Sequence, residues 1–191
     1  MEQQDILSMT LPELQAAVQE LGEPKFRAKQ IFNWLHQKRV TDFSEMTTLS
    51  LPFRERLASD FCINRLKIAK RLASSVDDTV KYLYELPDGN YVETVCMQYH
   101  HGTSLCISTQ VGCRMGCRFC ASAIAGFVRN LTPAEMLLQI YETERAQNCK
   151  ISSLVLMGIG EPLDNFDNVL RFLQLLSDPN GYGMSLRHVT V

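Results

Sequence analysis

The sequence predicts an α/β protein in which a small helical module and a short antiparallel β segment precede the first βα units of a barrel-like domain. Apolar residues recur at helical spacing within residues 1–63, whereas residues 64–100 contain runs rich in β-branched and aromatic residues. Over residues 101–191, apolar strand-like runs alternate with helical patterns, as in parallel βα units. These patterns define three segments and place the chemistry of the last one at the C-terminal ends of its strands.

The composition is that of an ordinary soluble globular protein. Of 191 residues, 46% are hydrophobic and 21% are charged, and the net charge of −2 neither indicates nor excludes a nucleic-acid partner. No run approaches the ~18 apolar residues of a transmembrane helix, and the N-terminus lacks the basic and apolar regions of a signal peptide. We therefore expect a cytoplasmic protein with no membrane association. Seven cysteines, three of them close together, favour thiol or metal chemistry over a disulfide framework.

Three short helices are expected in the first segment. The first begins at Thr10, which has capping-box spacing to Glu13, and ends at Gly22. The second follows Pro24, and the third occupies about residues 50–61. Residues 1–9 are expected to be frayed. Basic residues on the outer helix faces are compatible with contacts to an RNA backbone and, equally, with an ordinary solvated surface.

The middle segment is expected to form strands at residues 66–73, 80–86 and 91–99. Between the last two, the sequence Pro-Asp-Gly-Asn at residues 87–90 is a strong turn signal. His100 and His101 are predicted to lie in a solvated turn rather than at a metal site, because no third ligand is close in sequence.

The last segment predicts a strand at residues 104–109 that leads directly into a cysteine-rich loop. A helix then begins at Thr132, with a capping box to Glu135. The continuous apolar run at residues 151–157 predicts a buried parallel strand, and a helix over residues 165–176 precedes a further strand. That strand is unfinished at Val191, so we expect the chain to be a truncated product.

Three cysteines, Cys113, Cys117 and Cys120, form the most informative motif. Three residues and then two separate them, and the loop contains no histidine. Zinc usually takes four protein ligands, whereas a [4Fe–4S] cluster held by three thiolates has one iron without a protein ligand. An amine and a carboxylate could chelate that iron, which favours S-adenosylmethionine chemistry. A zinc site with a distant fourth ligand and purely structural thiols are the alternatives. Phe119 could lie beside a bound adenine or simply pack.

A second motif, containing Gly158, Gly160 and Glu161, follows the predicted strand at residues 151–157. The two glycines allow the backbone to approach a ligand closely, and the glutamate can accept hydrogen bonds from a ligand ammonium. Gly-x-Gly alone is common in turns. One βα unit after the cysteine loop, however, it strengthens the prediction of a cofactor site.

These motifs resemble those of one bacterial family. The resemblance is carried by residues 22–30, 92–95, 105–112, 113–120 and 157–163. The family comprises radical-SAM methyltransferases that modify C2 of adenine in 23S rRNA and in tRNA next to the anticodon. The resemblance implies that residues 101–191 begin a partial (β/α) radical-SAM barrel and that the helical module faces RNA. It also implies a [4Fe–4S] cluster, S-adenosyl-L-methionine, rRNA and tRNA substrates and an external electron donor.

By matching position, the resemblance assigns the cluster to Cys113, Cys117 and Cys120, and the methionine part of S-adenosylmethionine to Gly160 and Glu161. Cys106 matches a resolving cysteine, which releases a covalent RNA adduct by forming a disulfide, and Glu93 matches a proton acceptor. C2 of adenine is not nucleophilic, so the family uses a methyl group carried on a cysteine and needs both a base and a thiol. Without the resemblance, Glu93 would be interpreted as a surface residue and Cys106 as a core residue.

Two departures from the family pattern accompany the resemblance. Residues 122–126, Ser-Ala-Ile-Ala-Gly, differ from the usual serine, threonine and glycine pattern after the cluster motif. The methyl-carrying cysteine and the segments that complete the S-adenosylmethionine site are expected beyond residue 191, so this fragment is not expected to turn over. A C8-methylating rRNA resistance enzyme is the nearest alternative, although Val111, Pro162 and residues 127–131 favour the C2 enzyme. A non-catalytic metal-binding or RNA-binding remnant is the alternative from another class.

Overall fold

The computed structural model describes residues 3–124 and 126–191. The chain divides into two compact units: unit 1 comprises Met1–Asn64 with Leu173–Met184, and unit 2 comprises Arg65–Phe172 with Ser185–Val191. In the described part of the chain, no helix is long and apolar enough to span a membrane. The sheet of unit 2 continues across residue 100, where the sequence suggested a boundary.

Unit 1 contains the expected helices. They are α1 (Leu11–Glu20), α2 (Phe26–His36) and α3 (Leu51–Asp60); the short 3-10 turn η1 (Ile6–Ser8) precedes α1, and η2 (Phe43–Glu45) lies between α2 and α3. The Glu13 carboxylate accepts a hydrogen bond of 2.8 Å from the Thr10 amide, as the capping box predicts. Burial lowers the pKa of His36, on α2, from 6.5 to about 4.

The prediction that residues 1–9 are frayed is wrong for residues 3–9; Met1 and Glu2 lie outside the described residues. Strand β1 (Gln4–Asp5) pairs in parallel with β2 (Phe61–Cys62). Ile6 and Leu7 are buried with exposures of 0% and 2%. Burial of these two apolar side chains anchors the segment to unit 1. The polar residues that precede them in the sequence did not indicate this burial.

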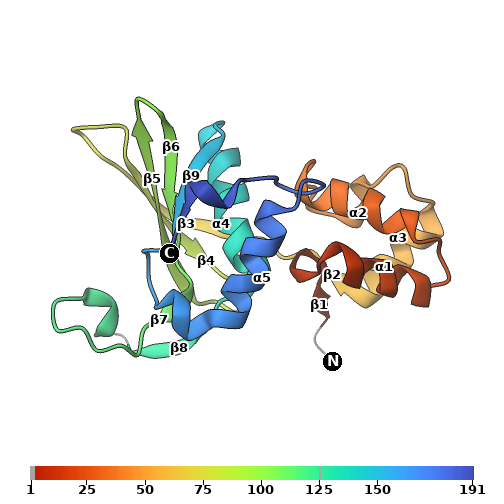
Figure 1. Cartoon of the computed structure of the whole chain (residues 1–191), viewed down its shortest axis with the longest axis horizontal. Coiled ribbons are helices and arrows are strands. Elements are labelled where there is room, and N and C mark those ends of the chain that lie inside the picture. Colours follow the sequence, from red (N-terminus) through yellow and green to blue (C-terminus); the bar gives the residue numbers. More distant parts are fainter. Residues whose placement is uncertain (1–2, 125) are drawn as a thin grey trace. The chain divides into compact units, whose positions relative to one another are not determined.

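Unit 2 is built on a mixed six-stranded sheet with the order β10-β9-β6-β5-β4-β3 (Figure 1). The strands are β3 (Lys67–Ala73), β4 (Val80–Glu85), β5 (Tyr91–Tyr99), β6 (Gly102–Cys106), β9 (Ile151–Val155) and β10 (Val189–Thr190). Strands β3 to β6 are antiparallel, whereas β6, β9 and β10 are parallel. The described strands form an open sheet and not a closed barrel. The α/β class and the parallel βα units follow the prediction.

Helix α4 (Pro133–Gln147) covers one face of this sheet. The Tyr84 hydroxyl lies 2.8 Å from the Thr143 hydroxyl, and the Thr94 hydroxyl donates to Gln139 Oε1 at 2.8 Å. Side chains on the opposite face of β5 are only half-buried. The remaining helices are the 3-10 turns η3 (Ala121–Ala123), η4 (Pro162–Asn165) and η5 (Leu186–His188), and α5 (Phe166–Ser177), whose residues divide between the two units.

The strand predicted at residues 104–109 ends at Cys106 instead, and so the cysteine loop does not directly follow a strand of the main sheet. Strands β7 (Gln110–Gly112) and β8 (Phe127–Asn130) form a separate antiparallel pair before and after the loop. The reason lies at Ser108, whose amide donates to Gln139 Oε1 and whose carbonyl accepts from Gln139 Nε2, both at 2.9 Å. A buried side chain of α4 thus takes the hydrogen bonds that a neighbouring strand would otherwise make.

Candidate cofactor site

The three cysteines lie in a loop at the tip of the β7–β8 hairpin, here called the cysteine hairpin. Figure 1 shows this loop extending away from the main sheet. The Cys113 amide donates to the Gly126 carbonyl at 3.0 Å and closes the loop at its base. A second bond of 3.0 Å, from the Cys120 amide to the Cys117 carbonyl, forms a tight turn. Of the earlier motif 122–126, Ala125 lies outside the described residues.

The donor set of this loop suits an iron–sulfur cluster chemically. Of its three cysteines, Cys117 is exposed and Cys113 and Cys120 are half-buried. Cluster ligands are thiolates, and no competing histidine or carboxylate lies between the cysteines in the sequence. Within the described residues, however, no three cysteine, histidine or acidic side chains converge on a common point. The loop supplies the right ligands without holding them in a coordinating arrangement.

The second motif lies directly against the start of the cysteine hairpin. Gly158 donates to the Ile107 carbonyl at 3.0 Å, and the Ile159 carbonyl accepts from Thr109 and Gln110 at 2.9 and 3.2 Å. A Cβ atom at Gly158 would lie 2.6 Å from the Ile107 carbonyl oxygen, and one at Gly160 would lie 2.6 Å from the side chain of Gln110. Gly160 also has a φ of +107°, which favours glycine. The glycines are therefore required for the contact between the two segments.

The Gln110 side chain connects the two motifs. It is fully buried, and its Oε1 accepts from the Glu161 amide at 2.9 Å. Its Nε2 donates to Asn130 Oδ1 at 2.8 Å and to Asp164 Oδ2 at 2.7 Å. Asp164 Oδ2 also lies 2.9 Å from Nε of Arg114, inside the cysteine loop. A continuous set of polar contacts thus runs from the cysteine loop to the backbone of Glu161.

The Glu161 carboxylate caps the turn that follows it. One oxygen accepts from the Leu163 amide at 3.0 Å, at the start of η4. A carboxylate has about four acceptor positions, so Glu161 retains capacity for a ligand amine.

Glu93 and Cys106 lie on the same face of the main sheet, opposite α4. Val95 of β5 pairs with Cys106 of the neighbouring β6, and Glu93 is two residues from Val95. Residues in this diagonal relation are typically about 7–8 Å apart. Glu93 forms an ion pair of 2.7 Å with Lys81 of β4. Burial raises the pKa of the Cys106 thiol, which keeps it protonated at neutral pH.

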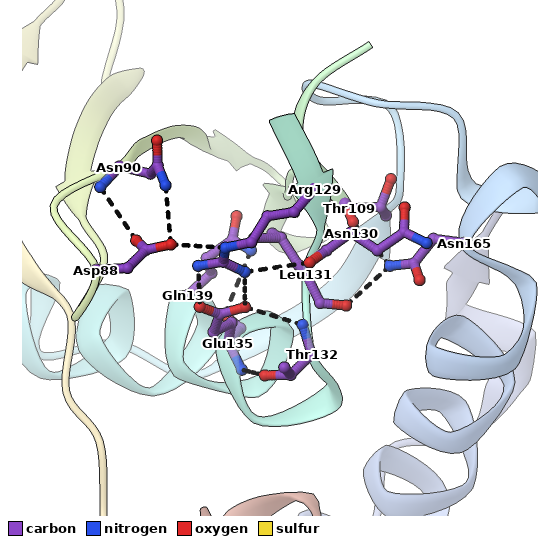
Figure 2. Close-up of polar contacts among 10 residues, drawn as sticks. All are labelled: Asp88, Asn90, Thr109, Arg129, Asn130, Leu131, Thr132, Glu135, Gln139 and Asn165. Atoms are coloured by element: carbon purple, nitrogen blue, oxygen red, sulfur yellow. Dashed lines mark hydrogen bonds and ion pairs between the residues drawn. The ribbon is translucent and has the colours of Figure 1, made fainter. Parts of the chain in front are cut away.

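The cysteine hairpin is anchored at its root by Arg129 on β8 (Figure 2). Its guanidinium contacts both oxygens of Glu135, at 2.8 and 2.7 Å, and Asp88 at 2.6 Å. The hydrogen bond from Arg129, followed by that from Asn90, holds the pKa of Asp88 well below its usual range. Glu135 and Asp88 belong to the start of α4 and the β4–β5 turn, so one side chain joins three elements.

Asn165 adds a second tie beside this root. Its side-chain amide donates to the carbonyls of Thr109 and Leu131 at 2.8 and 2.9 Å, and both contacts are buried (Figure 2). The amide therefore joins the segments before and after the cysteine hairpin to the end of η4, directly before α5.

No sequence motif identified Gln110, Asp164 or Arg129 as a part of the site. Glu135 appeared only as a capping residue and Asp88 only as a turn residue. Their local signals were correct, because Glu135 does accept from the Thr132 amide at 2.9 Å. No local pattern shows that these residues meet, since 41 positions separate Asp88 from Arg129 and 54 separate Gln110 from Asp164.

Comparisons with known proteins identify the family. Residues 4–63 match a model of the ribosomal RNA large subunit methyltransferase N-terminal domain. The chain is 52% identical over 190 residues to a probable dual-specificity RNA methyltransferase RlmN of Lachnoclostridium phytofermentans, covering 98% of this chain and 52% of that protein. The chain belongs to the RlmN family. A second probable RlmN, from Alkaliphilus oremlandii, is 50% identical over 191 residues and matches 100% of this chain and 55% of its own length.

A solved structure supports the same assignment of the fold. The crystal structure of a radical SAM methyltransferase from Sphaerobacter thermophilus matches with a TM-score of 0.89 and 33% identity, over 97% of this chain and 55% of that chain. The predicted family and α/β radical-SAM fold are therefore confirmed, and the C8-methylating alternative receives no support. The chain spans about half the length of the curated RlmN relatives it matches.

Proposed function

We propose that this RlmN-family chain carries the cofactor-binding part of a radical-SAM methyltransferase that methylates C2 of adenine in 23S rRNA and in tRNA. The observation that carries the proposal is the direct contact between the cysteine hairpin and the loop of Gly158, Gly160 and Glu161, at the C-terminal ends of β6 and β9. The relatives named as dual-specificity RNA methyltransferases supply the substrate class. A cytoplasmic location and an external electron donor belong to the same proposal.

In this proposal, Cys113, Cys117 and Cys120 hold a [4Fe–4S] cluster. Because the described loop does not gather the three sulfur atoms, cluster binding would draw them together. The backbone at Gly160 and the carboxylate of Glu161 would bind the methionine part of S-adenosylmethionine. With both groups bound, the site would supply radical chemistry. Such chemistry can replace the hydrogen of a C–H bond that is inert to polar methyl transfer.

Glu93 and Cys106 would act on the RNA from the open face of the main sheet. Glu93 is proposed to accept the proton that leaves adenine C2, and Lys81 at 2.7 Å orients its carboxylate. Cys106 is proposed to release the RNA by forming a disulfide with the second, methyl-carrying cysteine, as the bond between that cysteine's sulfur and the RNA-linked carbon breaks and its electron pair stays with the carbon. Because burial raises the pKa of the Cys106 thiol, the thiol would stay protonated and unreactive until a base removes its proton.

Anaerobic reconstitution with iron and sulfide tests the cofactor assignment. The wild-type chain is expected to bind about four irons and, after reduction, to show the EPR signal of a cubane cluster that changes when S-adenosylmethionine is added. Cys117→Ser should abolish the signal, whereas Cys149→Ser, at a cysteine without a proposed role, should retain it. Uptake of one zinc and no iron by the wild type would instead support a non-catalytic metal-binding protein.

The reaction is tested with the complete gene product in cells that lack other enzymes of this family. Digests of rRNA and tRNA should contain 2-methyladenosine, and Glu93→Gln should lower its amount by about 100-fold or more, as expected for loss of a general base. Detection of 8-methyladenosine without 2-methyladenosine would refute the proposed position of methylation.

A further inference from the structure

We propose that Arg114, Asp164 and Gln110 form a positioning relay that fixes the cysteine loop relative to the Glu161 backbone. The inference rests on the proposed function, because it concerns the alignment of the two cofactor-binding loops. It adds three residues that the family motifs do not assign to any role. None of them would need to touch the reacting atoms.

The geometry of the relay centres on a single oxygen. Asp164 Oδ2 accepts a hydrogen bond from Gln110 Nε2 at 2.7 Å and forms an ion pair with Arg114 Nε at 2.9 Å. Gln110 then accepts from the Glu161 amide through its other terminal atom, at 2.9 Å. A displacement of Arg114 can therefore reach Glu161 through Asp164, either by way of Gln110 or by the 3.1 Å hydrogen bond from the Asp164 amide to the Glu161 carbonyl.

Burial makes the Gln110 end of the relay rigid. Gln110 has an exposure of 0% and uses both terminal atoms of its amide, so rotation of that amide would leave buried groups unpaired. Gly160 packs closely against this side chain, since a Cβ atom at Gly160 would lie 2.6 Å from Gln110 Cβ. The amide thus has one orientation, and this orientation determines where the Glu161 backbone lies.

The Arg114 end is more exposed but is held from two sides. The Arg114 side chain has an exposure of 52%, and that of Asp164 has one of 24%. The guanidinium also stacks on the Phe127 ring of β8, with 3.8 Å between its central carbon and the ring centroid. Arg118, four residues further along the same loop, is exposed and provides a matched control.

Hydrogen exchange of the metal-free chain tests the relay without any cofactor. Asp164→Leu should accelerate amide exchange in residues 158–163 by about tenfold, and Arg114→Leu by a smaller factor. The double variant should exchange no faster than Asp164→Leu, because Arg114 acts only through Asp164. Arg118→Leu should leave this exchange unchanged. Equal exchange in Arg114→Leu and Arg118→Leu, or additive effects in the double variant, would overturn the relay.

Further measurements separate a change in the relay from unfolding of the variant. Exchange in the centre of α4 reports whether a variant remains folded, and Asp164→Asn offers a milder change if Asp164→Leu does not fold. With the reconstituted protein, Asp164→Leu should bind iron normally but require about tenfold more S-adenosylmethionine for the EPR change. An unchanged requirement would overturn the positioning role. A wild type that binds no iron would refute the proposed function, and with it the cofactor alignment, even if the exchange coupling is observed.

Discussion

The root and the tip of the cysteine hairpin are built in opposite ways. At the root, Glu135 has a side-chain exposure of only 7% and both of its oxygens contact Arg129. At the tip, Phe119 and Ile124 have exposures of 94% and 89%. Large apolar side chains exposed together on one loop commonly mark a binding surface. The contrast teaches that the protein fixes where the loop begins and ends, and leaves its centre open for a ligand to organise.

This division would suit the proposed cluster site. Three thiolates must converge on one cluster, and the described loop does not bring them together on its own. A rigid root restricts the loop to a small volume, which lowers the entropy that is lost when the ligands converge. The polar network of Arg129 and the amide of Asn165 would therefore lower the entropy cost of bringing the three thiolates together, without contacting them.

Replacing Arg129 at the root is expected to cause the largest loss of stability. Arg129→Leu removes the partner of the buried Glu135 carboxylate, and an uncompensated buried charge costs about 3 kcal/mol or more. The stability loss should be measured by hydrogen exchange in β5 and α4, because the single tryptophan, Trp34, reports on unit 1. Arg118→Leu, at the tip, should change stability by less than about 0.5 kcal/mol. Similar losses in both variants would show that the root is no better anchored than the tip.

The sequence predicted elements whose signals are local. The strand expected at residues 91–99 is β5 (Tyr91–Tyr99), because its alternating pattern and the preceding turn are contiguous. The helix expected at Thr132 is α4, for which the capping box sufficed. The β7–β8 pair was missed because only three and four residues form it, and because Gln139 of α4 ends β6 early. The cofactor motifs were recognisable from spacing, whereas the contacts that position them join distant residues.

Acidification should weaken the root through Asp88. Arg129 holds the pKa of this carboxyl below its usual value, so the folded state binds fewer protons than the unfolded state. The stabilising contribution is thus complete above about pH 4 and is lost as the pH falls below it. Asp88 has an exposure of 40%, so solvent screening limits the contribution to about 0.5–1 kcal/mol. The stability difference between wild type and Asp88→Asn should therefore shrink below pH 4. A difference that does not change with pH would show that the ion pair adds nothing.

The smallest effect on stability is expected at the tip, where a substitution should instead weaken the binding of S-adenosylmethionine. Phe119→Ala removes an exposed ring and should change the free energy of unfolding by less than about 0.5 kcal/mol. If the ring lies beside the adenine of S-adenosylmethionine, its loss should weaken binding by about fivefold, as expected for one aromatic contact. Binding is measured by the EPR change of the reconstituted protein. Val76→Ala, at a side chain that is 93% exposed in the β3–β4 turn, should alter neither quantity. A clear loss of stability in Phe119→Ala would show that the tip packs against the protein, and the division between a fixed root and an open tip would then fail.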